Sequence, residues 1–166
     1  MKPSPEETLV DVDEAVADQL LQLAKRDASP DEVAPPLGGP GWNLERTAWF
    51  YSYHQAAAGG LDGPAAEKSW AVFSGSLIAG SVRLKRETSS GTPSGETGIW
   101  LGRSFRSRGI GAAALDLVLA EARRAGLRRV TARTLAGNHR AQRLLAAAGA
   151  ALTSDGEGTV LAVVDL

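Results

Sequence analysis

The sequence predicts a mixed α/β fold in which helices flank a mostly antiparallel central sheet. Three observations predict it: two helix-type segments come first, two short strand-type runs around a Ser-Gly-Ser turn follow, and strand and helix patterns then alternate. This order of elements is typical of a layered domain with helices packed on a sheet. The chain has 166 residues and no internal repeat or linker, so we expect one domain over residues 1–166.

The first part of the chain predicts a short strand and two helices separated by a loop. Residues 8–12 are the strand, and residues 13–25 carry the apolar spacing of an amphipathic helix. The segment 29–41 contains four prolines and three glycines, so we expect a loop, and long loops in compact domains are often functional. Asn43 is a suitable N-cap for the second helix, which would end at residues 59–60.

The rest of the chain alternates between short strands and helices. In order we expect strands at 69–73 and 77–85, a turn cluster at 88–95, a strand at 98–101, a helix at 109–125, a strand at 127–134, a helix at 138–148, and strands at 150–152 and 159–164. Gly126 and Gly149 would close the two helices, because a residue in the left-handed conformation after the last turn favours glycine.

Composition disfavours several classes of protein. A net charge of −1 disfavours a dedicated nucleic-acid or anionic-membrane binder, and the absence of cysteine with only two histidines disfavours a metal site. No apolar run approaches the roughly 18 residues of a membrane span, and residues 1–7 lack the apolar core of a signal peptide. We therefore expect a cytoplasmic enzyme or binding protein with no nucleic-acid or membrane partner.

Residues 96–111 predict a site for a polyanion. A strand candidate ends at Leu101, a basic loop runs from Arg103 to Arg108, and Gly109-Ile110-Gly111 opens a long Ala- and Leu-rich helix. The first N–H groups of a helix have no partner within it, and the helix dipole favours negative charge there. The two glycines allow close approach of a diphosphate to the backbone, to which the N–H groups from Ser107 to Ala112 can donate.

Two nucleotide-binding templates fit this segment poorly. The P-loop string is absent. The dinucleotide fingerprint is matched literally by residues 109–114, but seven residues separate Leu101 from Gly109, where that fold has almost none. The following strand also ends in Arg133-Thr134 where an acidic residue is required. A nucleotide-dependent oxidoreductase is therefore disfavoured.

A third template fits better. Arg106-Ser107-Arg108-Gly109-Ile110-Gly111 resembles the pyrophosphate-binding motif of the GNAT superfamily of N-acetyltransferases, and the likeness extends over residues 96–149. Residues 96–101 are similar to the fourth strand of that family, 126–130 to the helix exit into the fifth, and 138–149 to an Asn-led helix. Leu145 stands seven residues after Asn138, as in the RimJ/RimL-type branch, where many other members have Tyr.

The resemblance implies acetyl-CoA as a co-substrate, held between splayed fourth and fifth strands. A backbone N–H on the fourth strand, that of Leu101, would polarise the thioester carbonyl and stabilise an oxyanion. For Arg106 and Arg108 charge-assisted bonds and simple solvation both stay open, and for Asn138 helix capping is at least as good a reading as a contact with the cofactor. The cofactor-binding residues implied are Trp100, Leu101, Arg106, Ser107, Arg108, Gly109, Ile110, Gly111, Ala112 and Asn138.

The sequence indicates the general acid and base less clearly than the cofactor site, because the usual acids of the family are absent. Leu145 replaces the usual Tyr, and Ala141 stands where RimJ/RimL-type relatives often have Ser. A thiol of pKa about 8.5 can leave as thiolate without one. Glu96 is the first candidate for the base, directly or through water, with a solvated carboxylate as the alternative. His54 is the second, with packing as the alternative.

The sequence therefore predicts an acetyl-CoA-dependent N-acetyltransferase in which an amine attacks directly within a ternary complex. The acceptor would be a small-molecule amine or a protein N-terminus, and the choice between monomer and homodimer stays open. Tyr51, Tyr53, Trp42 and Trp49 would border the acceptor, and Arg83 would face solvent or an acceptor carboxylate. The alternative is a non-catalytic acyl-CoA-binding regulatory module, which the missing Tyr and Ser would also fit.

Overall fold

The computed structural model describes residues 6–88 and 91–166. Its elements are β1 (Glu7–Asp11), α1 (Glu14–Asp27), α2 (Pro30–Val33), α3 (Leu44–Ala57), β2 (Glu67–Ser74), β3 (Leu77–Glu87), β4 (Ser94–Leu101), the 3-10 helix η1 (Arg103–Phe105), α4 (Ile110–Arg124), β5 (Arg129–Leu135), α5 (His139–Ala147), β6 (Ala151–Ser154) and β7 (Thr159–Asp165).

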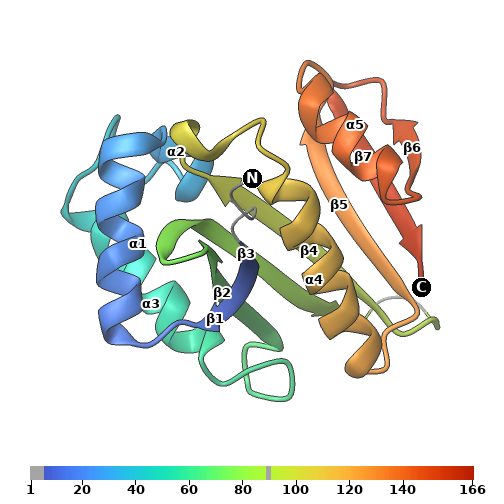
Figure 1. Cartoon of the computed structure of the whole chain (residues 1–166), viewed down its shortest axis with the longest axis horizontal. Helices are drawn as coiled ribbons and strands as arrows, with labels where there is room; N and C mark the ends of the chain where they lie inside the picture. The colour runs from blue at the N-terminus through green and yellow to red at the C-terminus, as the bar shows by residue number, and fades with distance from the viewer. Residues whose placement is uncertain (1–5, 89–90) are drawn as a thin grey trace, which may run out of the picture.

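The strands form one sheet in the order β1-β2-β3-β4-β5-β7-β6, and every neighbouring pair except β4 and β5 is antiparallel. Helices α1 and α3 lie together beside the first four strands, α4 crosses the sheet, and α5 packs on β6 and β7 (Figure 1). The predicted mixed α/β fold with a mostly antiparallel sheet is confirmed.

Two apolar clusters hold the layers together, one on each face of the sheet. On one face α4 contributes Ile110, Leu115 and Val118, which pack with Val82, Leu84 and Val130 of the strands. On the other face α1 and α3 contribute Leu20, Leu23 and Phe50, which pack with Ala71 and Ile78. Burial of these side chains is the main stabilising contribution, at about 25 cal/mol per Å² of apolar surface removed from water.

Two predicted segments differ most from the structure. The segment 29–41 contains the short helix α2, because Pro30 is suited to the first helical position and Asp31 and Glu32 lie in its first turn. Strand β4 begins at Ser94, inside the predicted turn cluster, because its first residues pair with the end of β3. Residues 89–90 of that cluster lie outside the described part of the chain.

The predicted caps are confirmed. The Asn43 side chain accepts a hydrogen bond from the backbone N–H of Arg46 at 2.9 Å at the start of α3. Gly126 and Gly149, which follow α4 and α5, have φ of +81° and +93°. These are left-handed values that favour glycine.

The strands β4 and β5 diverge. They pair in parallel only from Ser94 to Glu96 on β4, opposite Arg129 to Thr131 on β5. Beyond this point β5 continues beside β7, and β4 and β5 separate toward the end at which α4 begins (Figure 1). The predicted splayed pair is therefore present. In the described ranges no helix combines the length and the apolar character that crossing a membrane requires.

Candidate active site

Two pockets meet at β4. The first, of about 540 Å³, lies between α3 and the sheet and is called here the α3-side pocket; Trp49, Tyr53, Glu67, Arg83 and Glu96 are among its lining residues. The second, of about 550 Å³, lies in the opening between β4 and β5 and is called the gap pocket; Leu101, Arg106, Gly111, Arg133, Asn138 and Arg140 are among its lining residues. Both are lined by Glu32, Gly98, Ile99 and Trp100.

The alternating direction of its side chains explains why β4 lines both pockets. Side chains on a strand point alternately to its two faces. Ile99 and Leu101 pack against the core under α4, whereas Trp100 packs against the core under α1 and α3. The strand therefore presents different side chains to the two sides of the sheet over only a few residues.

The backbone of Leu101 faces the gap. Gly102 N–H donates to the Ala79 carbonyl at 2.9 Å, which continues the ladder between β3 and β4. Along antiparallel strands, hydrogen-bonded pairs alternate with pairs that are not hydrogen-bonded. Since Gly102 and Ala79 are a hydrogen-bonded pair, the next pair, Leu101 and Gly80, is not hydrogen-bonded. Leu101 thus turns its N–H and C=O away from β3. The C=O accepts from Nε and Nη2 of Arg106 at 3.2 and 3.0 Å.

The loop before α4 exposes backbone donors. Ser107 and Gly109 have φ of +62° and +81°, and Gly109 is the N-cap residue. The first N–H groups of any α-helix have no acceptor within the helix, and this applies to the first residues of α4. Apart from its chain neighbours, no heavy atom of the described residues lies within 4 Å of where a Cβ of Gly109 would stand. A Cβ on Gly111 would lie 2.8 Å from Cδ1 of Leu144, so this glycine permits the close packing of α5.

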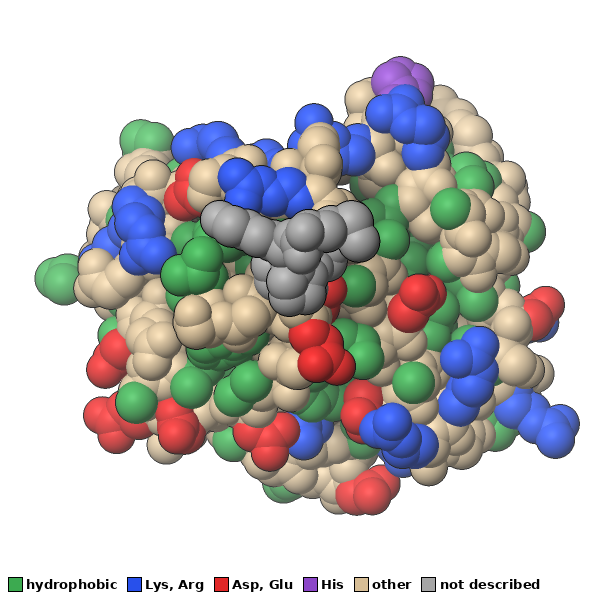
Figure 2. Space-filling view, viewed as in Figure 1, with side chains coloured by type: hydrophobic (Ala, Val, Ile, Leu, Met, Phe, Trp, Pro, Cys, Tyr) green, Lys and Arg blue, Asp and Glu red, His purple; other side chains and the backbone are tan. Residues whose placement is uncertain are grey.

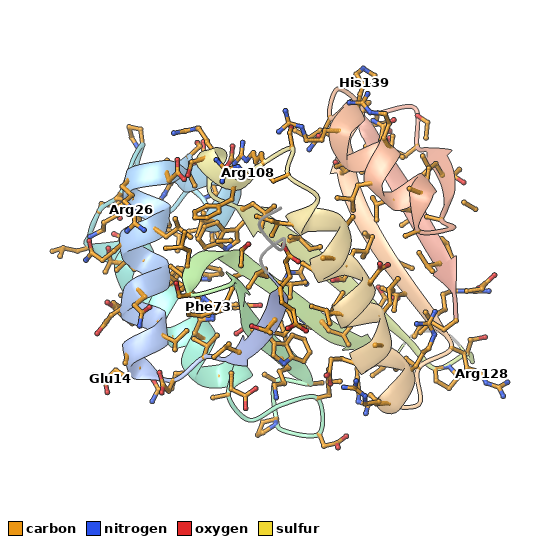
Figure 3. All side chains as sticks on the ribbon, viewed as in Figure 1. Glu14, Arg26, Phe73, Arg108, Arg128 and His139 are labelled. Atoms are coloured by element: carbon orange, nitrogen blue, oxygen red, sulfur yellow. The ribbon has the colours of Figure 1, made fainter. Side chains whose placement is uncertain are left out.

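The arginines of the motif have different surroundings. Besides the Leu101 carbonyl, the Arg106 guanidinium binds the Glu32 carboxylate of α2, with Nη2 and Oε2 2.5 Å apart. Arg108 is exposed at the edge of the molecule where α4 begins (Figure 3). Lys and Arg side chains gather along this edge (Figure 2). Arg133 and Arg140 line the gap pocket but were not predicted as site residues, since only the general concentration of arginine pointed to them.

The positions of the usual acids of the family hold no proton donor. Asn138 caps α5 by accepting from the Ala141 N–H at 3.1 Å, which confirms its capping role. Leu145 is 7% exposed and belongs to the core under α4. His139 is exposed and extends from the N-terminus of α5 to the outside (Figure 3).

A chain of charged and polar groups crosses the α3-side pocket. Arg83 Nη2 lies 2.9 Å from Oε1 of Glu96, and Arg83 Nη1 lies 3.8 Å from Oε2 of Glu67. The Tyr53 hydroxyl donates to the same Glu67 oxygen at 2.6 Å. Burial and this bond raise the pKa of Tyr53, so Tyr53 is a neutral donor near neutral pH. Arg83 therefore faces two carboxylates of the protein, a pairing that sequence alone did not indicate.

Two of the four aromatic side chains expected to border the acceptor line this pocket. Trp49 and Tyr53 line it and stack with ring centroids 5.1 Å apart. Tyr51, one of the expected walls, instead donates to Asp18 of α1, because it lies on another side of α3 from Tyr53. Trp42 packs edge-to-face on Phe50.

His54 is a packed residue. It is 4% exposed, its Nδ1 lies 2.8 Å from the Ser69 hydroxyl, and burial lowers its pKa to about 4. The ring is therefore neutral near neutral pH. Nowhere in residues 6–88 or 91–166 do three or more His, Asp or Glu side chains come together in a way that could hold a metal ion.

The class of protein follows from the splayed strands, the helix N-terminus and the sequence comparison. The chain belongs to the acetyltransferase (GNAT) domain family, whose model matches residues 9–151. It is therefore an enzyme of the acyltransferase class. Among curated protein sequences none matches this chain significantly.

Solved structures show the same fold at low sequence identity. RimJ of Mycobacterium smegmatis, in complex with a CoA disulfide, is 18% identical with a TM-score of 0.77, covering 96% of this chain and 81% of that one. RimL, a ribosomal L7/L12 α-N-protein acetyltransferase in complex with coenzyme A, is 16% identical with a TM-score of 0.75, covering 96% and 94%. The microcin C7 self-immunity acetyltransferase MccE, in complex with acetyl-CoA and AMP, is 16% identical with a TM-score of 0.73, covering 97% and 93%.

Proposed function

We propose that this chain is an acetyl-CoA-dependent N-acetyltransferase that transfers the acetyl group to a primary amine. The observation that carries the proposal is the gap pocket, where the N–H of Leu101 faces a space that also adjoins the start of α4. The complexes of RimJ, RimL and MccE with CoA or acetyl-CoA support the same assignment.

The residues around the gap fit the parts of acetyl-CoA. Backbone N–H groups from Ser107 to Ala112 would bind the pyrophosphate, with Gly109 leaving room for close approach and Arg108 adding positive charge. The pantetheine arm would lie along Ile99 to Leu101, between Trp100 and the N-terminus of α5 at Asn138. Arg106 would act on this site through the Leu101 carbonyl, which its guanidinium holds.

The acceptor would enter the α3-side pocket. Three carboxylates line it, those of Glu32, Glu67 and Glu96, against two cations, Arg83 and Lys85. Since Arg83 is already paired with Glu67 and Glu96, it is not a free cation for an acceptor carboxylate, which fits an amine as the acceptor. RimL, which shares this fold, is named as an acetyltransferase of a protein α-amine.

The transfer is a direct displacement. The neutral amine nitrogen forms a bond to the acetyl carbon while the Leu101 N–H stabilises the oxyanion, and the carbon–sulfur bond then breaks. The sulfur leaves as thiolate, because a thiol of pKa about 8.5 needs little help near neutral pH. The ammonium proton must pass to a base, and Glu96 faces this pocket as one candidate, directly or through water. A second proton passes from the nitrogen to water as the amide forms.

The test is release of CoA thiol from acetyl-CoA in the presence of a panel of aliphatic amines, amino-acid amides and peptides. We expect release with at least one class of amine and a matching acetylated product by mass spectrometry. Tight acetyl-CoA binding without turnover on any amine would instead support the regulatory module. No binding of any CoA thioester would contradict both.

A further inference from the structure

Glu32 lies where the two pockets join. It is one of the four residues that line both pockets, and the other three, Gly98, Ile99 and Trp100, carry no ionisable side chain. In the proposed reaction the thioester and the amine must meet at this junction. Glu96 lines the α3-side pocket but not the gap pocket, and its carboxylate is already bound to Arg83 at 2.9 Å.

The carboxylate of Glu32 is held in place by an arginine. Its Oε2 lies 2.5 Å from Nη2 of Arg106, and the same guanidinium donates to the Leu101 carbonyl. One ion pair therefore fixes Glu32 relative to the residue whose N–H faces the gap. The side chain remains 39% exposed, so a proton taken up there can pass to solvent.

The helix that carries Glu32 is itself anchored. The neighbouring Asp31 accepts a hydrogen bond from Nη2 of Arg46 at 2.7 Å, and Arg46 is 1% exposed within α3. Val33 packs against the core under α1 and α3. Helix α2 is thus tied to α3 through Asp31, to the core through Val33 and to the loop before α4 through Glu32, which suits a group that must be positioned with respect to two substrates.

We propose that Glu32 contacts the acceptor amine and takes the proton that its ammonium form must lose. The proton moves from nitrogen to a carboxylate oxygen of Glu32, the nitrogen lone pair then bonds to the acetyl carbon, and the electron pair of the broken carbon–sulfur bond leaves with the thiolate. As the amide forms, the nitrogen loses its second proton to water. Arg106 is a positioning residue in this step. The proposal rests on the proposed function and makes Glu32, rather than Glu96, the proton acceptor.

The experiment compares Glu32→Gln with the wild type on two amines, the most active Lys-like alkylamine and the most active α-amine of the panel. Glu121→Gln is the matched control, because it removes a carboxylate that is also paired with an arginine, Arg124, but lines neither pocket. At pH 7.5 a Lys-like amine of pKa about 10.4 is almost entirely protonated, whereas an α-amine of pKa about 7.8 is roughly one-third neutral. A base is therefore needed mainly for the alkylamine.

We expect Glu32→Gln to lower kcat/KM for the alkylamine about 100-fold and for the α-amine less than about 10-fold, with unchanged affinity for acetyl-CoA. The difference between variant and wild type should shrink as the pH approaches the pKa of the alkylamine, a trend that a merely structural role would not produce. Equal losses for both amines, or an equal loss in Glu121→Gln, would overturn the role of Glu32 while leaving the activity in place. A wild type that releases no CoA thiol would overturn the proposed function itself.

Discussion

Arg83 and Glu96 form an ion pair across β3 and β4, with Nη2 and Oε1 2.9 Å apart, on the face of the sheet that lines the α3-side pocket. Gly98, which is paired with Arg83 in the ladder, leaves room for it: a Cβ there would lie 3.0 Å from Arg83 Nε. The arginine can therefore lie along β4 and reach the carboxylate. This relationship sets the charge of the pocket, because one guanidinium serves both Glu96 and Glu67.

A double-mutant cycle measures this pair. Both side chains are partly exposed, so we expect a coupling free energy of about 1 kcal/mol between Arg83→Gln and Glu96→Gln, from urea unfolding. Arg83→Gln alone should destabilise more than Glu96→Gln alone, because it leaves two carboxylates without their shared cation. A coupling free energy near zero would show that the pair contributes nothing to stability.

The phosphate placement predicts a charge effect at Gly109. Gly109→Asp and Gly109→Asn both place a short side chain at φ +81°, a conformation that Asn and Asp tolerate better than most residues. We expect Asn to weaken CoA binding a few-fold and Asp at least about 10-fold more, because only Asp brings negative charge to the start of α4. Isothermal titration calorimetry with CoA measures both, and similar dissociation constants for the two variants would count against the placement.

Buried His54 predicts a dependence of stability on pH. Its pKa is about 4 in the folded protein, because burial disfavours the charged ring, against 6.5 for the unfolded chain. The unfolded state therefore binds more protons between these values. The stability associated with neutral His54 is fully present above pH 6.5 and is lost as the pH falls toward 4, by an amount of the order of 3 kcal/mol.

The variant His54→Gln tests that assignment. Glutamine keeps a polar group opposite the Ser69 hydroxyl but does not titrate, so the free energy of unfolding should vary less between pH 4 and 6.5. An unchanged pH dependence in the variant, measured by urea unfolding across that range, would assign the effect to other groups.

The ion pair of buried Arg46 with Asp31 predicts that replacing the arginine and replacing the aspartate change stability by different amounts. Within the described part of the chain, its Nε and Nη1 are buried without a hydrogen-bond partner, and Nη2 binds Asp31. Arg46→Met should therefore be close to neutral in stability or stabilising, because it removes a costly buried charge. Asp31→Asn should destabilise by about 1–3 kcal/mol, because it leaves that charge less well compensated. Thermal unfolding of the two variants distinguishes them, and a larger loss for Arg46→Met would contradict this account.

The buried position of Leu145 predicts that replacing it with Tyr, the usual acid of the family, does not supply a proton donor to the site. Leu145→Tyr would place a larger side chain in the core under α4, where Leu145 is 7% exposed. We expect a loss of about 1–3 kcal/mol in stability and no gain in turnover. Differential scanning calorimetry and the thiol-release assay measure the two effects, and a stable, faster variant would show that the helix can turn this position toward the thioester.

Much of the fold could be predicted from local patterns. The helix starts at Asp13 and Asn43, the exits at Gly126 and Gly149, and the β2–β3 hairpin depend on interactions between residues close in the chain, and the structure has them where expected. Helix α2 was missed because proline and glycine dominate its segment, and Pro30 favours a helix start only if the next residues adopt helical geometry.

For the site, the sequence by itself determined the parts that belong to one continuous segment: the strand ending at Leu101, the turn through Gly109 and the start of α4. Backbone N–H groups and a helix dipole need only local sequence to be placed. Only the tertiary structure decided the rest. It placed Glu32 of α2 beside Arg106, and it placed Arg83 between Glu67 and Glu96. It also buried Leu145 in the core under α4. Such pairings depend on which distant elements the sheet and its helices bring together, and no local pattern specifies that.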